Sequence, residues 1–321
     1  MFCMDDKCWL LGIDGGGTKT VCVAADQGGV VRARGRGGPS NYHAEGLERA
    51  VKSVAEAVDE ALVQVGGRRE EVVVVCAGLA GVARRTDRRV MGDALRRLFP
   101  AGELRLETDA KIALVGGTGG RPGIIVSAGT GSVAFGVNEV GKEAKVGGWG
   151  YLFGDEGSGY DIARRGLTAV LRAFDGRGSA TSLQQAFLTT LQLDSPDDLI
   201  PVLYSNPLSP GRVAALFPLV LQEADEGDAV AVGIIRDAAE ALAELAVTAV
   251  LRLDLGVSPC LLVVSGGVFE GKLLRRWFEE AVRGRLPQAR VVAPEAPPEV
   301  GAVQLALEMW RGRDATGDGP H

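Results

Sequence analysis

The stretch that decides the fold is Leu11 to Thr20, LGIDGGGTKT, followed directly by the apolar run VCVAA. It begins as an apolar run and then breaks into an acid, three glycines and a threonine. Apolar runs on both sides of a glycine-rich turn predict a β-hairpin. Because glycine has no Cβ atom, the backbone N–H groups of such a turn can approach an anion closely. The stretch therefore predicts a phosphate-binding hairpin, with an ordinary tight turn as the alternative.

Within this turn, the candidate phosphate ligands are Gly16, Gly17, Thr18 and Lys19. Asp14, at the end of the first strand, is the candidate to hold Mg²⁺ through a water molecule. Two standard nucleotide loops do not fit. A Walker A loop needs lysine where Thr18 stands, and both that loop and the dinucleotide fingerprint continue as a helix, whereas VCVAA is typical of a strand.

A second hairpin of the same plan is predicted at IIVSAGTGSVAFG, from Ile124 to Gly136. Its turn contains Thr130 and Gly131, which offer a hydroxyl and an unobstructed amide to the opposite side of a polyphosphate. Two hairpins of one plan indicate a duplicated architecture.

A third motif is LLVVSGGVFEG, from Leu261 to Gly271. A strand of the buried type runs into Gly266 and Gly267, and the start of the helix that follows is placed to meet a nucleoside. Taken alone, this motif is equally well explained as a plain turn between a strand and a helix.

Together, DGGGTKT, SAGTGS and SGGVFEG resemble, in this order, the two phosphate motifs and the adenosine motif of the sugar kinase, Hsp70 and actin superfamily. The stretch GGWGYLFGDEGSGYDIARRGL, Gly147 to Leu167, is similar to the signature of N-acetylglucosamine kinases and the BadF/BadG/BcrA/BcrD ATPase family. This resemblance extends from about Leu10 to Trp310.

The resemblance implies an α/β fold with two ribonuclease-H-like (actin-like ATPase) domains and an interdomain cleft for nucleotide and sugar. It places the first domain at 1–115 plus a returning C-terminal helix at 296–321, and the second at 116–295. A length of 321 residues independently favours two domains. The glycine-rich stretch 116–123 is expected to be a loop, and the part from 157 to about 255 mostly helical.

Composition narrows the class of protein. The formal net charge of −6 gives no support for nucleic acid as the partner, and the arginine-rich stretch 84–89 reads as a solvated helix face. No apolar stretch is typical of a membrane span, and MFCMDDKC lacks a signal-peptide pattern. The five scattered cysteines do not indicate a disulfide framework. We therefore expect a cytoplasmic protein with no membrane partner.

Phosphoryl transfer needs a base for the acceptor hydroxyl, and Asp109, at the end of LRLETDA, is the candidate. It aligns with the catalytic aspartate of N-acetylglucosamine kinases. The alternative is that Asp109 caps the helix that follows, since aspartate before Ala-Lys-Ile-Ala is a good N-cap.

The sugar site is expected around Gly148, Trp149 and Asp155, which the resemblance carries over. Trp149 would offer a flat apolar surface to a sugar ring, with a core aromatic as the alternative. Asp155 would accept hydrogen bonds from sugar hydroxyls while capping the helix that starts near Gly157. Asn41 resembles the asparagine that binds sugar hydroxyls in these kinases, although asparagine after Pro-Ser also suits a turn.

Two further positions follow from the resemblance. Ala224 lies in ADEGD, which is similar to the family's loop on the adenine side of the nucleotide site. Ala80 departs from the mammalian pattern, because a serine that contacts the sugar stands there in the mammalian N-acetylglucosamine kinase. This departure weakens the inference that the protein is specific for N-acetylated sugars.

The sequence thus predicts a Mg²⁺- and ATP-dependent kinase that phosphorylates an amino sugar, N-acetylglucosamine or glucosamine, at the C6 hydroxyl. A homodimer is expected from the family. Two alternatives share the fold: an ATPase that activates a reductase or dehydratase, and a nucleotide-dependent sensor. The activators hold an iron–sulfur cluster with clustered thiolates, and beyond residue 116 this chain has only Cys260.

Overall fold

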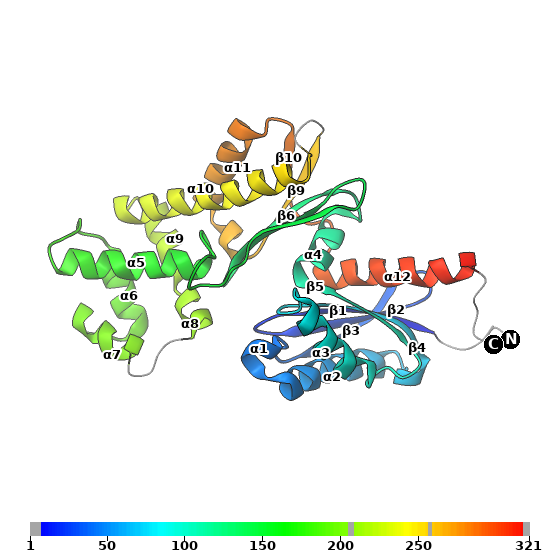
Figure 1. Ribbon diagram of the computed structural model, residues 1–321. Helices are drawn as coiled ribbons and strands as arrows, with labels where there is room; N and C mark the ends of the chain where they lie inside the picture. Colours follow the sequence, from blue (N-terminus) through cyan, green and yellow to red (C-terminus); the bar gives the residue numbers. More distant parts are fainter. Residues whose placement is uncertain (1–7, 205–208, 256–258, 317–321) are drawn as a thin grey trace. The chain divides into compact units, whose positions relative to one another are not determined.

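The computed structural model describes residues 8–204, 209–255 and 259–316. The chain divides into two compact units, with boundaries between Arg121 and Pro122 and between Ala293 and Pro294 (Figure 1). Unit 1 contains the two outer parts of the described chain, and unit 2 contains the middle part.

Unit 1 is built on a five-stranded sheet of order β3-β2-β1-β4-β5. β1 pairs antiparallel with β2, and β2 with β3, whereas β4 and β5 run parallel to β1. The first hairpin is therefore present, and the glycine-rich turn joins its two strands. The strands are β1 (Trp9–Gly15), β2 (Thr20–Ala25), β3 (Val31–Gly37), β4 (Val72–Leu79) and β5 (Glu103–Thr108).

Helices cover both faces of this sheet (Figure 1). Because side chains alternate along a strand, Leu11 and Ile13 pack under α2 and α3, while Leu10 packs under α4 and α12. Burial on both faces explains why β1 reads as a nearly continuous apolar run. The helices are α1 (Tyr42–Glu45), α2 (Leu47–Gln64), the 3-10 helix η1 (Arg69–Glu71), α3 (Arg85–Arg96), α4 (Asp109–Thr118) and α12 (Pro298–Thr316).

Unit 2 repeats the same sheet plan. Its strand order is β10-β9-β6-β7-β8, again three antiparallel strands followed by two parallel ones. The predicted duplication and the α/β class are therefore confirmed. The strands are β6 (Gly123–Ala128), β7 (Ser132–Val137), β8 (Glu143–Gly147), β9 (Cys260–Ser265) and β10 (Ala289–Val292).

Helices make up most of the rest of unit 2, as expected for residues 157 to 255. The long helix α10 packs against β6, β7 and β8, and α5, α9 and α11 pack against α10. The helices are α5 (Gly159–Phe174), α6 (Leu183–Leu191), η2 (Pro196–Asp198), α7 (Leu199–Tyr204), α8 (Pro210–Ala214), α9 (Phe217–Asp225), α10 (Ala229–Arg252), η3 (Gly267–Glu270) and α11 (Lys272–Arg285).

The glycine-rich stretch 116–123 is a loop only in part, because α4 continues to Thr118 and β6 begins at Gly123. The cause is close packing of α4 on α12: a Cβ atom on Gly301 would lie 2.1 Å from the carbonyl oxygen of Ile112. Glycine in these helices lets two backbones approach each other. Residues 116–121, which the sequence analysis assigned to the second domain, thus pack in unit 1.

Among the described residues, no helix combines the length and the apolar character that crossing a bilayer requires.

Candidate functional site

The turn of the first hairpin is exposed and lies at the end of β1. Gly16 N donates to Lys19 O at 3.0 Å and closes the turn, which leaves Gly17, Thr18 and Lys19 exposed. Gly15 differs from its neighbours, because it is buried and a Cβ atom there would lie 2.2 Å from Ser40 Oγ. Of the three glycines, Gly15 therefore serves packing, and the other two leave space for an anion.

The second hairpin has the same form in unit 2. Gly129 N donates to Gly131 O at 2.9 Å, and Thr130 is exposed at the tip. Gly129 O in turn accepts from Gly159 N at 2.8 Å, which ties the first residue of α5 to this turn. The turn is thus held rigidly from behind while Thr130 faces outward.

Asp155 lies directly behind this second turn. Its Oδ1 accepts from Ser132 N at 3.3 Å, and a Cβ atom on Gly131 would lie 2.7 Å from its Oδ2. Burial raises the pKa of Asp155, and the hydrogen bonds from backbone N–H groups work in the opposite direction. The structure therefore brings a predicted sugar ligand and a predicted phosphate turn together.

The predicted capping role of Asp155 is wrong. α5 begins at Gly159, and its N-cap is Ser158, whose hydroxyl accepts from Asp161 N at 3.2 Å. Asp155 lies before the cap and has a left-handed backbone, with φ of 59°, so its side chain turns toward Ser132 instead.

Trp149 is not a core aromatic, since 78% of its surface is exposed. It follows Gly148, whose positive φ of 67° helps the chain to leave β8, and the Gly148 carbonyl accepts from Lys145 Nζ at 3.1 Å. The Lys145 ammonium also lies 6.0 Å from the Trp149 ring centre. The exposed ring excludes the core alternative and leaves its surface available to a ligand.

The third motif borders a cavity of about 400 Å³ in unit 2. Gly267 lines it together with one face of α9, and Ala224 is buried in that helix behind the lining residues. Sequence reasoning missed the lining residues on α9 before Ala224, although their spacing is that of one helical face, whereas the other lining residues fall within the quoted motifs. Besides Gly267, the lining residues are Phe217, Pro218, Leu221, Gln222, Asp225, Glu226, Glu270 and Gly271.

Gly266 joins this cavity to the second phosphate turn. Its φ is +100°, and a Cβ atom on it would lie 2.2 Å from Ala128 O, at the end of β6. Alanine at this position would have a strained backbone, and its Cβ atom would push Ala128, the residue before the turn, out of place.

We therefore expect Gly266→Ala to destabilise unit 2 by about 3 kcal/mol or more and to weaken ATP binding at least tenfold. Urea unfolding and ATP titration by calorimetry measure the two effects. Gly233→Ala, on α10 with open space around it, is the matched control. A stable Gly266→Ala protein with normal ATP affinity would contradict this account of the third motif.

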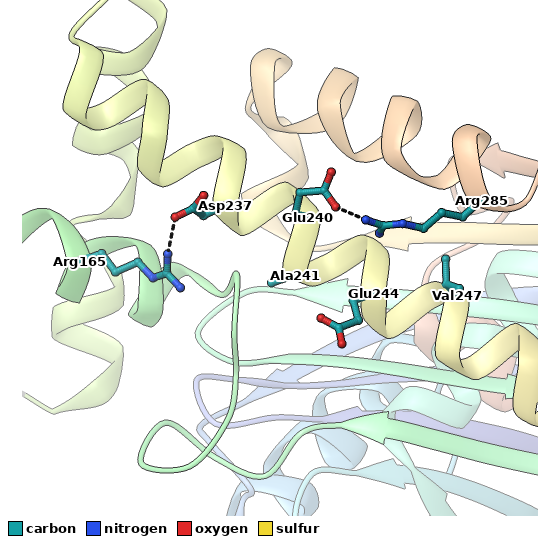
Figure 2. A pocket seen from close by; sticks show the side chains of 7 residues that line it. All are labelled: Arg165, Asp237, Glu240, Ala241, Glu244, Val247 and Arg285. Atoms are coloured by element: carbon teal, nitrogen blue, oxygen red, sulfur yellow. Dashed lines mark hydrogen bonds and ion pairs between the residues drawn. The ribbon is translucent and has the colours of Figure 1, made fainter.

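A different pocket of unit 2, about 560 Å³, has charged walls (Figure 2). Arg165 pairs with Asp237 at 3.1 Å, and Arg285 with Glu240 at 2.6 Å. None of the predicted site residues lines this pocket, whose remaining walls are Ala241, Glu244 and Val247.

In unit 1, carboxylates gather near the first turn. Burial, with the negative charges of Asp109 and Glu299, raises the pKa of Asp14 to about 7, and Lys19 opposes the shift. Glu299 is itself buried at the start of α12, where it pairs with Arg34 at 2.6 Å. The sequence analysis missed Glu299, since an acid in the first turn of a helix is common and marks no function.

Asp109 is the first residue of α4 and is exposed. The N-cap is Thr108, whose hydroxyl accepts from Lys111 N at 3.3 Å, so the capping alternative for Asp109 is wrong. Asp109 Oδ1 accepts from Ala110 N at 2.8 Å. Its carboxylate lies at an exposed helix start within electrostatic range of Asp14.

This arrangement fits Mg²⁺. The ion takes oxygen ligands, keeps several waters and is usually held by one or two carboxylates together with substrate phosphates. A cation near Asp14 would relieve its repulsion from Asp109 and Glu299. In the described chain, no three or more His, Cys, Asp or Glu side chains form a metal cage. The donors therefore suit an ion held through water and shared with a phosphate.

Asn41 lies close to the first turn. Ser40 N donates to Gly16 O at 3.0 Å, and Asn41 Oδ1 accepts from His43 N at 3.2 Å, so Asn41 caps α1. Ala80, where the sequence departs from the mammalian pattern, donates its N–H to Gly15 O at 2.8 Å. Unit 1 thus gathers Asn41, Ala80 and the first turn in one place.

A model of the BadF/BadG/BcrA/BcrD ATPase family matches residues 11–306. The chain belongs to this family. Its relatives include an N-acetylmuramic acid/N-acetylglucosamine kinase of Clostridium acetobutylicum, 35% identical over 93% of this chain and 98% of the relative. An N-acetyl-D-glucosamine kinase of Dictyostelium discoideum is also 35% identical, over 92% of this chain and 97% of the relative.

A solved structure supports the assignment to this family. A chain from Chromobacterium violaceum, provisionally assigned as an N-acetylglucosamine kinase, aligns with a TM-score of 0.78 and 30% identity. The alignment covers 94% of this chain and 99% of that one. Both predicted phosphate motifs and the third motif lie inside the matched region.

Proposed function

We propose that this protein is an ATP-dependent kinase of an amino sugar. The observation that carries the proposal is 35% identity, over nearly the whole length, to two relatives named as kinases of N-acetylated amino sugars. A glucosamine kinase of Vibrio cholerae, 29% identical over 72% of this chain, widens the substrate class to amino sugars in general.

The two hairpins would bind the phosphates of ATP. In unit 1, Gly16, Gly17, Thr18 and Lys19 present N–H groups, a hydroxyl and an ammonium on an exposed turn. In unit 2, Thr130 and Gly131 present the matching turn, and Gly266 and Gly267 lead to the cavity beside α9, which would take the adenosine with Ala224 behind its wall. Mg²⁺, when bound, neutralises phosphate charge.

Asp109 would accept the proton of the acceptor hydroxyl, which we assign to C6. Its place at an exposed helix start leaves the carboxylate accessible to a sugar, and a carboxylate within hydrogen-bond reach of a hydroxyl can act as its general base. Asp14, with its raised pKa, would hold Mg²⁺ through water. The negative charge that Asp109 and Glu299 place near Asp14 strengthens the attraction for a cation.

The sugar would be held by Asn41 in unit 1 and by Gly148, Trp149 and Asp155 in unit 2. The exposed Trp149 ring suits the apolar face of a sugar. The Asn41 amide nitrogen remains to donate to a sugar hydroxyl, because Oδ1 is engaged by His43 N. We expect the protein to act as a cytoplasmic homodimer, which size-exclusion chromatography with light scattering tests.

The alternatives are less well supported. An iron–sulfur activator needs clustered thiolates, whereas Cys260 is buried within β9 and is the only cysteine of unit 2. A nucleotide-dependent sensor has no need of a base, yet Asp109 is present beside Asp14.

The deciding experiment is ADP release by the purified protein with ATP and Mg²⁺ across a panel of sugars. The panel contains glucosamine, N-acetylglucosamine, N-acetylmuramic acid, N-acetylmannosamine, N-acetylgalactosamine and glucose. We expect release that depends on one or two amino sugars, with the phosphate located by NMR of the product. Release that is independent of sugar, or absent, would reject the kinase in favour of the activator or the sensor.

A further inference from the structure

The segment that carries Asn41 is held at its beginning by the first hairpin. Ser40 and Thr20 are both completely buried, and their hydroxyl oxygens lie 2.9 Å apart. The Thr20 hydroxyl donates to Gly38 O at 2.7 Å, and Ser40 N donates to Gly16 O at 3.0 Å. The residue before Asn41 is therefore fixed to the phosphate turn.

The segment is held at its other side by a single carboxylate from a different element. Asp87 lies on α3 and is only 8% exposed. Its Oδ1 accepts from the Tyr42 hydroxyl at 2.5 Å, and its Oδ2 lies 3.5 Å from His43 Nε2. Asp87 thus binds both residues that directly follow Asn41.

The His43 ring completes this second anchor. Its Nε2 lies 3.2 Å from Gly81 O, and because a carbonyl only accepts, Nε2 carries the hydrogen. The ring also stacks against Tyr42, with ring centres 4.1 Å apart. The hydrogen bond from Tyr42, the charge of Arg84 and the proximity of His43 lower the pKa of Asp87, which keeps it ionised.

The space around Asn41 leaves little freedom. Gly81 has φ of +85°, and a Cβ atom on it would lie 2.9 Å from Asn41 Oδ1 and 3.0 Å from His43 Cδ2. Glycine at this position lets the segment after β4 approach the Asn41 side chain. With Ser40 held on one side and Tyr42 and His43 on the other, the direction of the Asn41 side chain is determined by its neighbours.

We propose that Asp87 is a positioning residue that sets the affinity for the acceptor sugar, because it fixes Asn41 through Tyr42 and His43. The inference rests on the proposed kinase function. It goes beyond that function because Asp87 touches neither substrate in the proposal and belongs to none of the motifs assigned to the site. A carboxylate suits this place because one of its oxygens accepts from the Tyr42 hydroxyl while the other faces the His43 ring.

The test uses Tyr42→Phe, Asp87→Asn and the double variant, with Asp93→Asn as control. Asp93 lies on the same helix but is exposed and pairs with Arg96 one turn along that helix. We expect each single change to raise KM for the sugar about tenfold, with kcat and KM for ATP within about threefold of the unaltered protein. The double variant should resemble the single ones, since both remove one shared interaction. The control should keep all three constants.

The outcomes separate the two proposals. If the unaltered protein shows no sugar-dependent ADP release, the proposed function and the role of Asp87 both fail. If it is active but Tyr42→Phe and Asp87→Asn leave the sugar KM unchanged, or raise both KM values equally, only the positioning role fails. Thermal unfolding of each variant keeps loss of fold apart from loss of sugar affinity, because a merely structural defect would lower the melting temperature without a selective change in sugar KM.

Discussion

Asp109→Asn should lower kcat for sugar phosphorylation by about 10² to 10⁴-fold, the range that a general base contributes. Asparagine has nearly the same shape as aspartate but cannot accept a proton at neutral pH. The fold should tolerate the change, because Thr108, not Asp109, caps α4 and Asp109 is exposed. Stopped-time assays of sugar phosphate measure kcat, and calorimetric titration measures the affinity for ATP.

ATP affinity should stay within a few fold of the unaltered protein, since Asp109 contacts no phosphate in the proposal. Thr108→Ala is a useful comparison, because it removes the cap and should cost about 1 kcal/mol of stability without a comparable loss of kcat. An Asp109→Asn enzyme with full turnover would show that another group accepts the proton.

The two hairpins were predictable because their signal is local. Strand, turn and strand follow one another within the quoted stretches, and three glycines before a threonine need no distant partner to be recognised. The duplicated sheet order follows from the same local signal, repeated once. Thr18, Lys19 and Thr130 are exposed on those turns, so the structure leaves them accessible as the sequence implied.

What the sequence could not show are the residues that act through distant contacts. Asp87 reaches Tyr42 from another helix, and Glu299 approaches Asp14 from the far end of the chain. Neither acid stands in a distinctive local pattern. The arginines around Asp87 made that stretch look like a solvated helix face, and the burial of Asp87 appears only in the fold, where Tyr42 and His43 contact it.

The prediction of a loop at the glycines near the end of α4 was wrong for residues 116–118, for a related reason. A run of glycines is typical of a loop, and the sequence alone does not reveal that α12 will cross that helix. Gly116 and Gly301 meet where the two helices cross, and a Cβ atom on Gly301 would lie 2.4 Å from Gly116 N. The same residue type therefore has two roles in this chain: open space at Gly17 and close packing at Gly301.

Asp14→Asn should make the metal-free protein more stable at pH 8 while abolishing its activity. Burial raises the pKa of Asp14 from 3.8 to about 7 in the folded state. A raised pKa means that the folded state favours the protonated form, so the stability is greatest below pH 4 and falls as pH rises toward 7. At about 1.4 kcal/mol per pKa unit, the full loss is about 4 kcal/mol.

Asparagine is neutral at every pH and escapes this loss. In EDTA, the gain in stability from Asp14→Asn should therefore be about 4 kcal/mol at pH 8 and shrink to about 1.5 kcal/mol at pH 5. Urea unfolding at the two pH values, with Asp93→Asn as an exposed control, measures it. A gain that does not depend on pH would show that Asp14 ionises normally in the fold. Under the proposed function, the buried charge of Asp14 would destabilise the empty protein, and that cost is expected of a carboxylate placed to attract Mg²⁺.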